Sequence, residues 1–308
     1  MERFSILSSD NQTQLAAYCV VPDAPRAMVQ ISHGMCEYFL RYTPFAEFLA
    51  QNGILVFGHD HLGHGNSAKT SDDLGFTVKG GGAEHLIEDV HKLSLYMKEK
   101  YPDLPLVLFG HSMGSFIARE VLCRYGRTYT ASIICGTGGP ETPAAMGKLL
   151  ASMLMTFQGE RHRSKLLKKI SFMGYNKKCG KGCDKNAWLT RDESIVERYN
   201  ADPFCAYVFT IRAYHDLFSL VAKTSQRGWA HCILPTQPLL LISGEDDPVG
   251  GFGKGVRSVE KRLVQAGLKD LTTILYPKMR HEILNELEKE TVWKDILTWL
   301  ETKLPLQN

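Results

Sequence analysis

The segment LVLFGHSMGSF, residues 106–116, narrows the folds open to this chain more than any other stretch. Its first four residues are apolar, as in a buried strand, and a helix-compatible apolar stretch begins a few residues later. A strand that turns into a helix with almost no loop holds its turn residue in a sparsely allowed conformation. Gly110 and Gly114 lack side chains that would collide across such a turn. The pattern therefore predicts that Ser112 stands at the sheet edge, at a helix N-terminus.

Short apolar runs recur along the chain and alternate with stretches of helical spacing. One such stretch has Leu86, Val90, Leu93 and Met97 on one helix face. Strands that read as near-continuous apolar runs are typical of sheets buried on both faces. The sequence therefore predicts an α/β fold with a mostly parallel central sheet flanked by helices. The predicted strands are residues 4–7, 15–21, 28–32, 54–58, 106–110, 132–135, 239–243 and 272–276.

The alternation of strands and helices stops after Gly136 and resumes near residue 235. Between these positions the sequence is helical or irregular, without a convincing strand. We interpret residues 1–137 and 235–308 as two parts of one α/β core, and residues 138–234 as an inserted helical cap. An insertion between two strands of such a sheet is expected to lie over the carboxyl ends of the strands, where open α/β sheets bind ligands.

A nucleophilic serine needs a base, and the base needs an orienting acid. His281 follows the last predicted strand, in a loop before the C-terminal helix. Acidic residues at 245, 246 and 247 follow the strand before it. Serine, acid and histidine thus stand in the chain order expected for this architecture, although the residues alone do not choose among Glu245, Asp246 and Asp247.

The oxyanion formed in acyl transfer needs two N–H donors. One is expected from the amide of Met113, directly after the serine. The second is expected after the third predicted strand, where His33 and Gly34 allow a tight turn that exposes the amide of Met35. A plain glycine turn is the alternative for this loop.

The insertion contains an apolar helical pattern. Two interpretations are open: this face covers an acyl chain, or it packs on the core. The pattern comprises Leu149, Leu150, Met153, Leu154 and Phe157, and four of these, Leu150, Met153, Leu154 and Phe157, join Gly34 as candidates for substrate contact.

No metal or organic cofactor is expected. The histidines of HDHLGHG, residues 59–65, have no cysteine or paired carboxylate nearby to complete a familiar metal site, so a structural loop is the favoured interpretation. Cys179 and Cys183 have no second thiol pair, whereas structural zinc needs four ligands. We interpret them as incidental cysteines of a flexible loop, and the sequence gives them no role.

Location and partners follow from composition. Most of the eight cysteines stand alone in apolar stretches, as in a reducing compartment, and neither a signal-peptide pattern nor a membrane-spanning apolar run is present. We expect a cytoplasmic protein that binds no nucleic acid, of undetermined oligomeric state.

Residues 161–185 contain nine Lys or Arg and one Asp, a net charge of +8. The whole chain has a net charge of +3, so the remaining residues carry −5. This segment either contacts an anionic membrane peripherally or is a solvated loop.

The chain resembles the α/β-hydrolase superfamily, and within it the monoacylglycerol lipase and lysophospholipase-like serine hydrolases. The likeness extends over nearly the whole chain. Family members usually carry Glu-His after the oxyanion loop, whereas this chain has Glu37 and Tyr38. The matching text is SHGMCEYFLRY, GHDHLGHGNS, LFGHSMGS, WLTRDE, YNADPFCAYVFT, SGEDDPVG and RHEILNE.

This resemblance implies a serine carboxylester hydrolase that forms an acyl-enzyme on a lipid-like ester, most simply a monoacylglycerol or lysophospholipid. It implies that Ser112 is the nucleophile, His281 the base and Asp247 the acid, because the family acid stands three residues after Gly244. The same triad also serves amide or thioester hydrolysis and acyl transfer, which the sequence leaves open. A non-catalytic ligand-binding relative is the alternative of another class, and it has no need of all three side chains.

Overall fold

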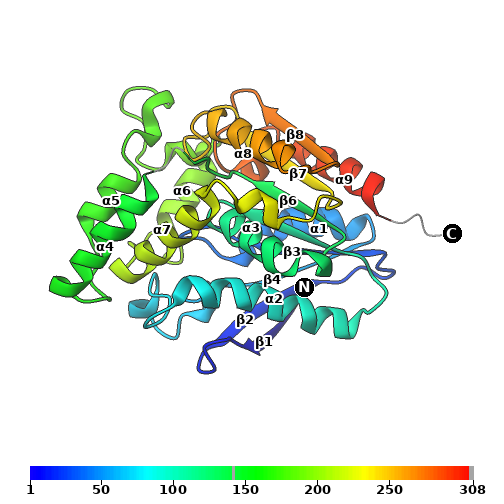
Figure 1. Ribbon diagram of the computed structural model, residues 1–308, viewed down its shortest axis with the longest axis horizontal. Helices are drawn as coiled ribbons and strands as arrows, with labels where there is room; N and C mark the ends of the chain where they lie inside the picture. Colours follow the sequence, from blue (N-terminus) through cyan, green and yellow to red (C-terminus); the bar gives the residue numbers. More distant parts are fainter. Residues whose placement is uncertain (141–142, 305–308) are drawn as a thin grey trace.

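A computed structural model of the protein describes residues 1–140 and 143–304 and contains one eight-stranded sheet (Figure 1). The strand order is β1-β2-β4-β3-β5-β6-β7-β8; β2 pairs antiparallel with β1 and β4, and the other neighbours are parallel. All eight predicted strands and the mostly parallel sheet are confirmed. The strands are β1 Glu2–Leu7, β2 Gln14–Val20, β3 Ala27–Ser32, β4 Ile54–His59, β5 Leu106–His111, β6 Ala131–Cys135, β7 Leu239–Gly244 and β8 Leu271–Tyr276.

Helices cover both faces of the sheet, as predicted. Helices α1 (Thr43–Gln51) and α9 (Lys289–Lys303) enclose one hydrophobic cluster, and α2 (Gly82–Lys100), α3 (Met113–Tyr125) and α8 (Lys254–Gln265) enclose another. Strands β4, β5 and β7 are buried along their whole length because each faces a helical layer on both sides. Short 3-10 helices complete the fold: η1 Phe39–Tyr42, η2 Gly65–Ser67, η3 Ser71–Asp73, η4 Gly126–Thr128, η5 Tyr175–Lys178, η6 Ala187–Leu189, η7 Trp229–Cys232 and η8 Ile283–Asn285.

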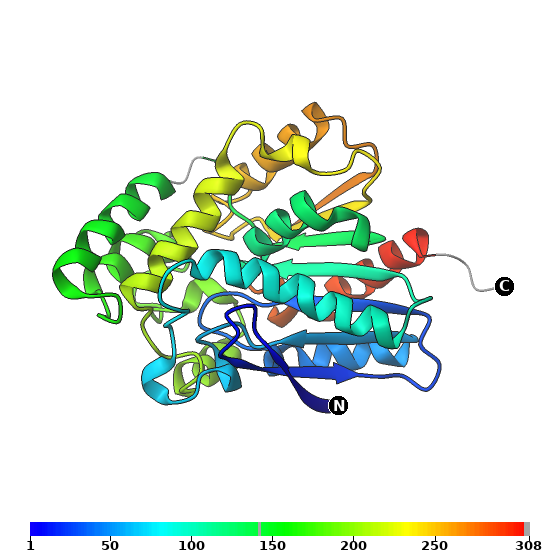
Figure 2. The same cartoon turned by 60° about the horizontal axis from the view of Figure 1, so that its bottom comes forward.

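The described part of the insertion between β6 and β7 is helical and contains no strand. It forms α4 (Ala144–Gln158), α5 (Lys165–Ser171), α6 (Glu193–Ala201) and α7 (Ile211–Ser225). Figures 1 and 2 show α4 and α5 at one end of the molecule, beyond the strands, with α7 between them and the core. Helix α7 packs on α2 and α3 of the core as well as on α4, and therefore joins the insertion to the core. The cap boundaries at 138 and 234 stay a prediction.

Helix α4 packs closely on α7 because its inner face carries small residues. Ala151 is fully buried, and a Cβ at Gly147 would lie 3.1 Å from the ring of Phe218. The apolar face expected on this helix is divided between two sides. Leu150 and Leu154 are partly buried against the core. Leu149, Met153 and Phe157 instead point outward, with exposures of 64%, 55% and 84%.

Candidate active site

Ser112 occupies the sharp turn between β5 and α3. Its φ of +52° and ψ of −120° lie in a region that non-glycine residues rarely adopt. A Cβ at Gly114 would lie 2.0 Å from the carbonyl oxygen of Ser32, and a Cβ at Gly110 would lie 2.4 Å from that of Gly114. Helix α3 can therefore approach β3 and β5 this closely only with glycine at both positions.

His281 and Asp247 form a buried pair beyond β7 and β8. His281 Nδ1 lies 3.0 Å from Asp247 Oδ1, and both side chains are almost completely excluded from solvent. Asp247 also accepts hydrogen bonds from the Ser243 hydroxyl at 3.0 Å and the Val249 amide at 2.8 Å. Burial alone would raise the pKa of Asp247, but the charge of His281 and these hydrogen bonds lower it. The carboxylate is therefore ionised and directed at the imidazole.

The two neighbouring acids have other surroundings. Asp246 forms an ion pair with Lys178 at 2.5 Å, near the surface. Glu245 is exposed. Of the three acidic residues that the sequence left open, Asp247 is the one that the structure brings to His281.

The predicted oxyanion loop lies beside the serine. A Cβ at Gly34 would be 2.9 Å from the Cβ of Ser112, so only glycine allows this approach. The Gly34 amide donates to the Glu37 carboxylate, which fixes the loop. Met35 is half-buried beside this turn, and Met113 is buried as the first residue of α3. The roles of the Met35 and Met113 amides stay a prediction.

A buried charged network that the sequence did not reveal surrounds these elements. Glu37 Oε1 lies 3.0 Å from His111 Nδ1, and Arg41 bridges Glu37 at 3.1 Å and Glu282 at 2.7 Å. Burial would raise the pKa of Glu37, but the charges of His111 and Arg41 lower it. Because Glu282 adjoins His281 and His111 adjoins Ser112, the network joins the three loops that carry the candidate site residues. The i, i+4 spacing of Glu37 and Arg41 was the available sequence signal.

Tyr38, in the loop after β3, turns toward the insertion. Its hydroxyl donates to Asp202 at 2.7 Å, and its ring meets the edge of Phe204. This residue therefore joins the oxyanion loop to the segment after α6.

The histidines of the loop after β4 gather with His33 behind the oxyanion loop. The rings of His33 and His61 are 4.3 Å apart, and those of His33 and His64 are 5.2 Å apart. Burial lowers the pKa of His33 and His59 to about 3 and that of His64 to about 4, so these rings are neutral near pH 7. Within residues 1–140 and 143–304, the His, Cys, Asp and Glu side chains form no group of three able to hold a metal.

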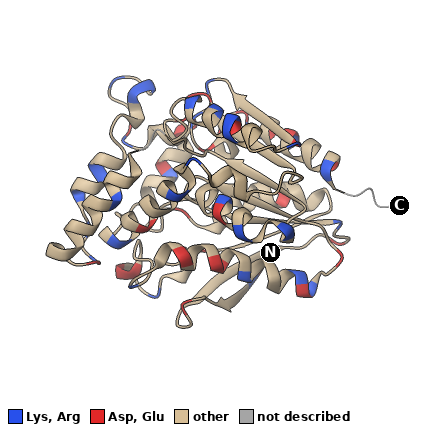
Figure 3. Ribbon diagram, in the orientation of Figure 1, with Lys and Arg blue, Asp and Glu red and all other residues tan. Residues whose placement is uncertain are grey.

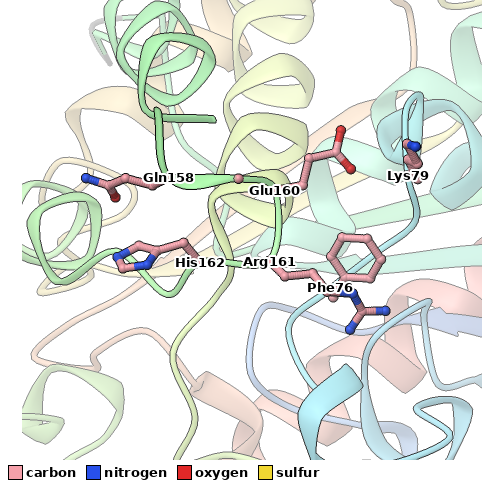
Figure 4. Close-up of a pocket in the computed structure, with 7 residues that line it drawn as sticks. Phe76, Lys79, Gln158, Glu160, Arg161 and His162 are labelled. Carbon is pink, nitrogen blue, oxygen red and sulfur yellow. The ribbon is translucent and has the colours of Figure 1, made fainter. Parts of the chain in front are cut away.

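A surface cavity of about 590 Å³ lies away from this site, where the end of α4 meets residues 76–79 (Figure 4). Phe76, Lys79, Glu160, Arg161 and His162 are among its lining residues, and Ser112 is not. Arg161 stacks on Phe76 at 4.0 Å and pairs with Asp73. The cavity therefore lies where the insertion meets the core, and it is not formed by the candidate active-site residues.

Strand order, turn and buried pair together define a class: the chain is a serine hydrolase with the α/β-hydrolase fold. A family model described as serine aminopeptidase, S33, matches residues 23–288, and the chain belongs to this family. The resemblance to the α/β-hydrolases is thereby confirmed.

Individual relatives are similar over most of their length. A monoglyceride lipase homolog of Monkeypox virus is 28% identical over 283 residues, which cover 90% of each chain. A monoacylglycerol lipase of Mycolicibacterium smegmatis is 29% identical and covers 92% of this chain and 91% of its own. Among solved structures, a thermostable carboxyl esterase from Bacillus coagulans in complex with glycerol has a TM-score of 0.91 at 30% identity, with 99% of both chains covered.

Proposed function

We propose that this protein hydrolyses carboxylic esters of single-chain lipids, monoacylglycerols or lysophospholipids, through an acyl-enzyme on Ser112. The observation that carries the proposal is the buried His281–Asp247 pair, with 3.0 Å between Nδ1 and Oδ1. A histidine held at Nδ1 by a carboxylate presents a basic Nε2 to a nucleophile. The names of the relatives, monoacylglycerol lipases and an esterase crystallised with glycerol, support the substrate class.

In the proposed reaction, His281 Nε2 takes the Ser112 hydroxyl proton as Oγ attacks the ester carbonyl carbon. The resulting oxyanion accepts hydrogen bonds from the Met35 and Met113 amides. The intermediate collapses, the C–O bond to the alcohol breaks, and His281 returns the proton to the leaving alcohol. Water, deprotonated by the same histidine, then releases the fatty acid and regenerates Ser112. Asp247 stays ionised and stabilises the imidazolium throughout.

The test pairs two serines of one turn. Ser112→Ala is expected to abolish hydrolysis of a monoacylglycerol and labelling by a fluorophosphonate, because removal of a triad member costs several orders of magnitude in kcat. Ser115→Ala is the matched control, since Ser115 is buried at the start of α3 and its hydroxyl donates to the Ser112 carbonyl. Labelling that persists in Ser112→Ala would refute the assignment of the nucleophile.

The substrate class has its own test. We expect kcat/KM to be higher for 1-monooleoylglycerol or oleoyl lysophosphatidylcholine than for acetyl esters, because Leu150 and Leu154 supply apolar surface between α4 and the core. Equal kcat/KM for acetyl and oleoyl esters of one alcohol would contradict a lipid substrate.

We further propose that the protein works in the cytoplasm and contacts anionic membranes through residues 161–185 and the outer face of α4 and α5. The free thiols of all eight cysteines support a reducing compartment. Residues 161–185 contain nine Lys or Arg and one Asp, whereas Figure 3 shows both charge signs over the helices of the core. The exposed apolar side chains beside these charges are Met146, Leu149, Met153, Phe157, Leu166, Ile170 and Met173. In the part of the chain that the structure describes, no helix is both long and apolar enough to span a bilayer.

Vesicle sedimentation tests this contact. We expect binding to phosphatidylserine-containing vesicles that falls with salt and when Lys165, Lys168 and Lys169 become Gln, since each basic residue near such a surface contributes about 1 kcal/mol. The control replaces the same number of exposed basic residues on a helix of the core: Lys254, Arg257 and Lys261, all on α8. Binding that is indifferent to both triple substitutions would contradict the proposal.

A further inference from the structure

The loop that carries His281, residues 280–286, lies against a short segment of the insertion, residues 187–191. Two main-chain hydrogen bonds join them: the His281 amide donates to the Trp188 carbonyl at 3.3 Å, and the Glu282 amide donates to the Leu189 carbonyl at 2.6 Å. The Thr190 hydroxyl donates to the Asn285 carbonyl at 3.0 Å. The histidine loop is thus paired with the insertion along most of its length.

Charged side chains strengthen the same contact. Arg280 donates to the carbonyl oxygens of Ala187 at 2.7 Å and Thr190 at 3.1 Å. Glu286, fully buried, accepts from the Arg280 amide at 2.8 Å and from Arg191 Nε at 3.0 Å. Both ends of segment 187–191 are therefore fixed to the histidine loop.

Trp188 also contacts the imidazole itself. Its ring centroid is 5.1 Å from that of His281, with the planes inclined by 38°. The rings of Tyr175 and Phe172 also pack against Trp188, with centroids 4.9 and 5.6 Å from that of Trp188. Trp188 is only 8% exposed, so this aromatic contact is held inside the protein.

The imidazole is held by its covalent bond to Cβ and by the hydrogen bond between Nδ1 and the Asp247 carboxylate. Small rotations of the side chain still bend this hydrogen bond and displace Nε2. Aromatic rings packed against the imidazole limit that freedom. The ring of Trp188 provides such a contact, tilted against the imidazole, in addition to the hydrogen bond with Asp247 and to the ring of His111, whose centroid is 4.7 Å from that of His281.

We infer that Trp188 is a positioning residue for the base, supplied by the insertion rather than by the α/β core. The inference rests on the proposed function, in which His281 is the base. It assigns the two halves of the insertion different tasks: segment 187–191 orients the catalytic imidazole, whereas α4 and α5 face the substrate and solvent.

The test compares two tryptophans of equal burial. Trp188→Leu is expected to lower kcat about 30- to 100-fold with KM nearly unchanged, because a displacement on the order of 1 Å in a catalytic group costs about two orders of magnitude. Trp188→Phe keeps an aromatic face and is expected to recover most of kcat. Trp299→Leu is the control, because Trp299 is 7% exposed in α9 and packs away from His281.

Proton NMR separates positioning from general destabilisation. The far-downfield Nδ1 proton shared by His281 and Asp247 is expected in the parent, Trp188→Phe and Trp299→Leu, and broadened beyond detection in Trp188→Leu. If Trp188→Leu does not fold, Thr190→Val removes the bond to Asn285 at constant shape and is expected to lower kcat several-fold at unchanged KM. A kcat equal to that of Trp299→Leu, with the downfield proton retained, would overturn the inference.

The proposed function can fail separately. If Ser112 is not the nucleophile, either Ser112→Ala is labelled by the fluorophosphonate like the parent, or neither protein is labelled. If only the role of Trp188 is wrong, the parent and Trp188→Leu are labelled at the same rate.

Discussion

His111 Nδ1 lies 3.0 Å from Glu37 Oε1, and its Nε2 lies 3.3 Å from the carbonyl oxygen of His281. Both neighbours are hydrogen-bond acceptors, so the protonated imidazole, which has a proton on each ring nitrogen, can donate to both. Burial would lower the pKa of His111, but the charge of Glu37 raises it above its ordinary value. When protonated, His111 therefore places a positive charge next to Ser112 in the chain and joins the loop of Gly34 and Glu37 to the histidine loop.

His111→Gln is expected to destabilise the fold in a pH-dependent way. A histidine with a raised folded pKa adds stability that is fully present below its unfolded pKa of about 6.5 and is lost as pH rises through the folded value. The loss in unfolding free energy should thus be about 3 kcal/mol at low pH and smaller at high pH. Urea unfolding of parent and variant at about pH 5.5 and about pH 9.5 measures this.

The control for this experiment is His91→Gln. His91 stacks on Tyr125 at the surface, and burial lowers its pKa, so any pH trend should have the opposite sign. A loss in His111→Gln that grows with pH would contradict the protonated pair.

Two adjacent aspartates should differ sharply in catalysis. Asp247→Asn should lower kcat about 10⁴-fold, because an amide at that position holds the wrong imidazole tautomer. Asp246→Asn removes only a surface pair with Lys178 and should change kcat by less than about threefold. Steady-state kinetics on one soluble ester decides between them, with circular dichroism to show that both variants fold. Equal losses would indicate that neither acid is specific to His281.

The buried histidines predict acid sensitivity. His33, His59 and His64 have folded pKa values of about 3 to 4, so the unfolded chain binds more protons between pH 6.5 and 4. Stability should therefore fall with falling pH, by about 1.4 kcal/mol per pH unit for each such histidine. His64→Gln should reduce the slope of unfolding free energy against pH by the contribution of one histidine, about 1.4 kcal/mol per pH unit. His231 is exposed, and His231→Gln should leave the slope unchanged. Unfolding titrations from about pH 7 to about pH 4 measure both slopes.

The two sides of α4 should respond differently to substitution. Ala151→Leu adds bulk where α4 meets α7 and should cost about 1–3 kcal/mol of stability. Phe157→Ser alters a side chain that is 84% exposed and should change stability by less than about 0.5 kcal/mol. Thermal unfolding of both variants provides the measurement, and a large loss from Phe157→Ser would show that the outer face is covered in solution.

Much of the core was predictable because buried strands leave a local signature. Strands such as β5 are unbroken apolar runs in the sequence. Gly110 and Gly114, within the five residues centred on Ser112, indicate a turn too tight for side chains at these two positions. The proximity of Asp247 and His281 follows from parallel strands that end at one edge. These features need only local patterning and sheet topology.

The remainder depends on partners far apart in the chain. Arg41 meets Glu282 across 241 positions, and no periodicity marks either residue as a member of a buried pair. The division of the α4 face was equally hidden, because Leu149 and Leu150 are both apolar and only the position of α7 decides which is covered. Nothing in the sequence around Trp188 indicates that its ring contacts His281, because this contact depends on how the histidine loop packs against the insertion.

The attachment of residues 187–191 to the histidine loop bears on how new specificities arise in such a scaffold. Helix α4 makes its main contacts with α7, so we expect that it can be exchanged or lengthened without disturbing the imidazole. Phe172, at the end of α5, and Tyr175 pack on Trp188 instead. If Trp188 positions the imidazole as proposed, a chimera with a foreign insertion should keep its turnover only when the boundary falls between α4 and Phe172, so that these aromatic contacts stay together.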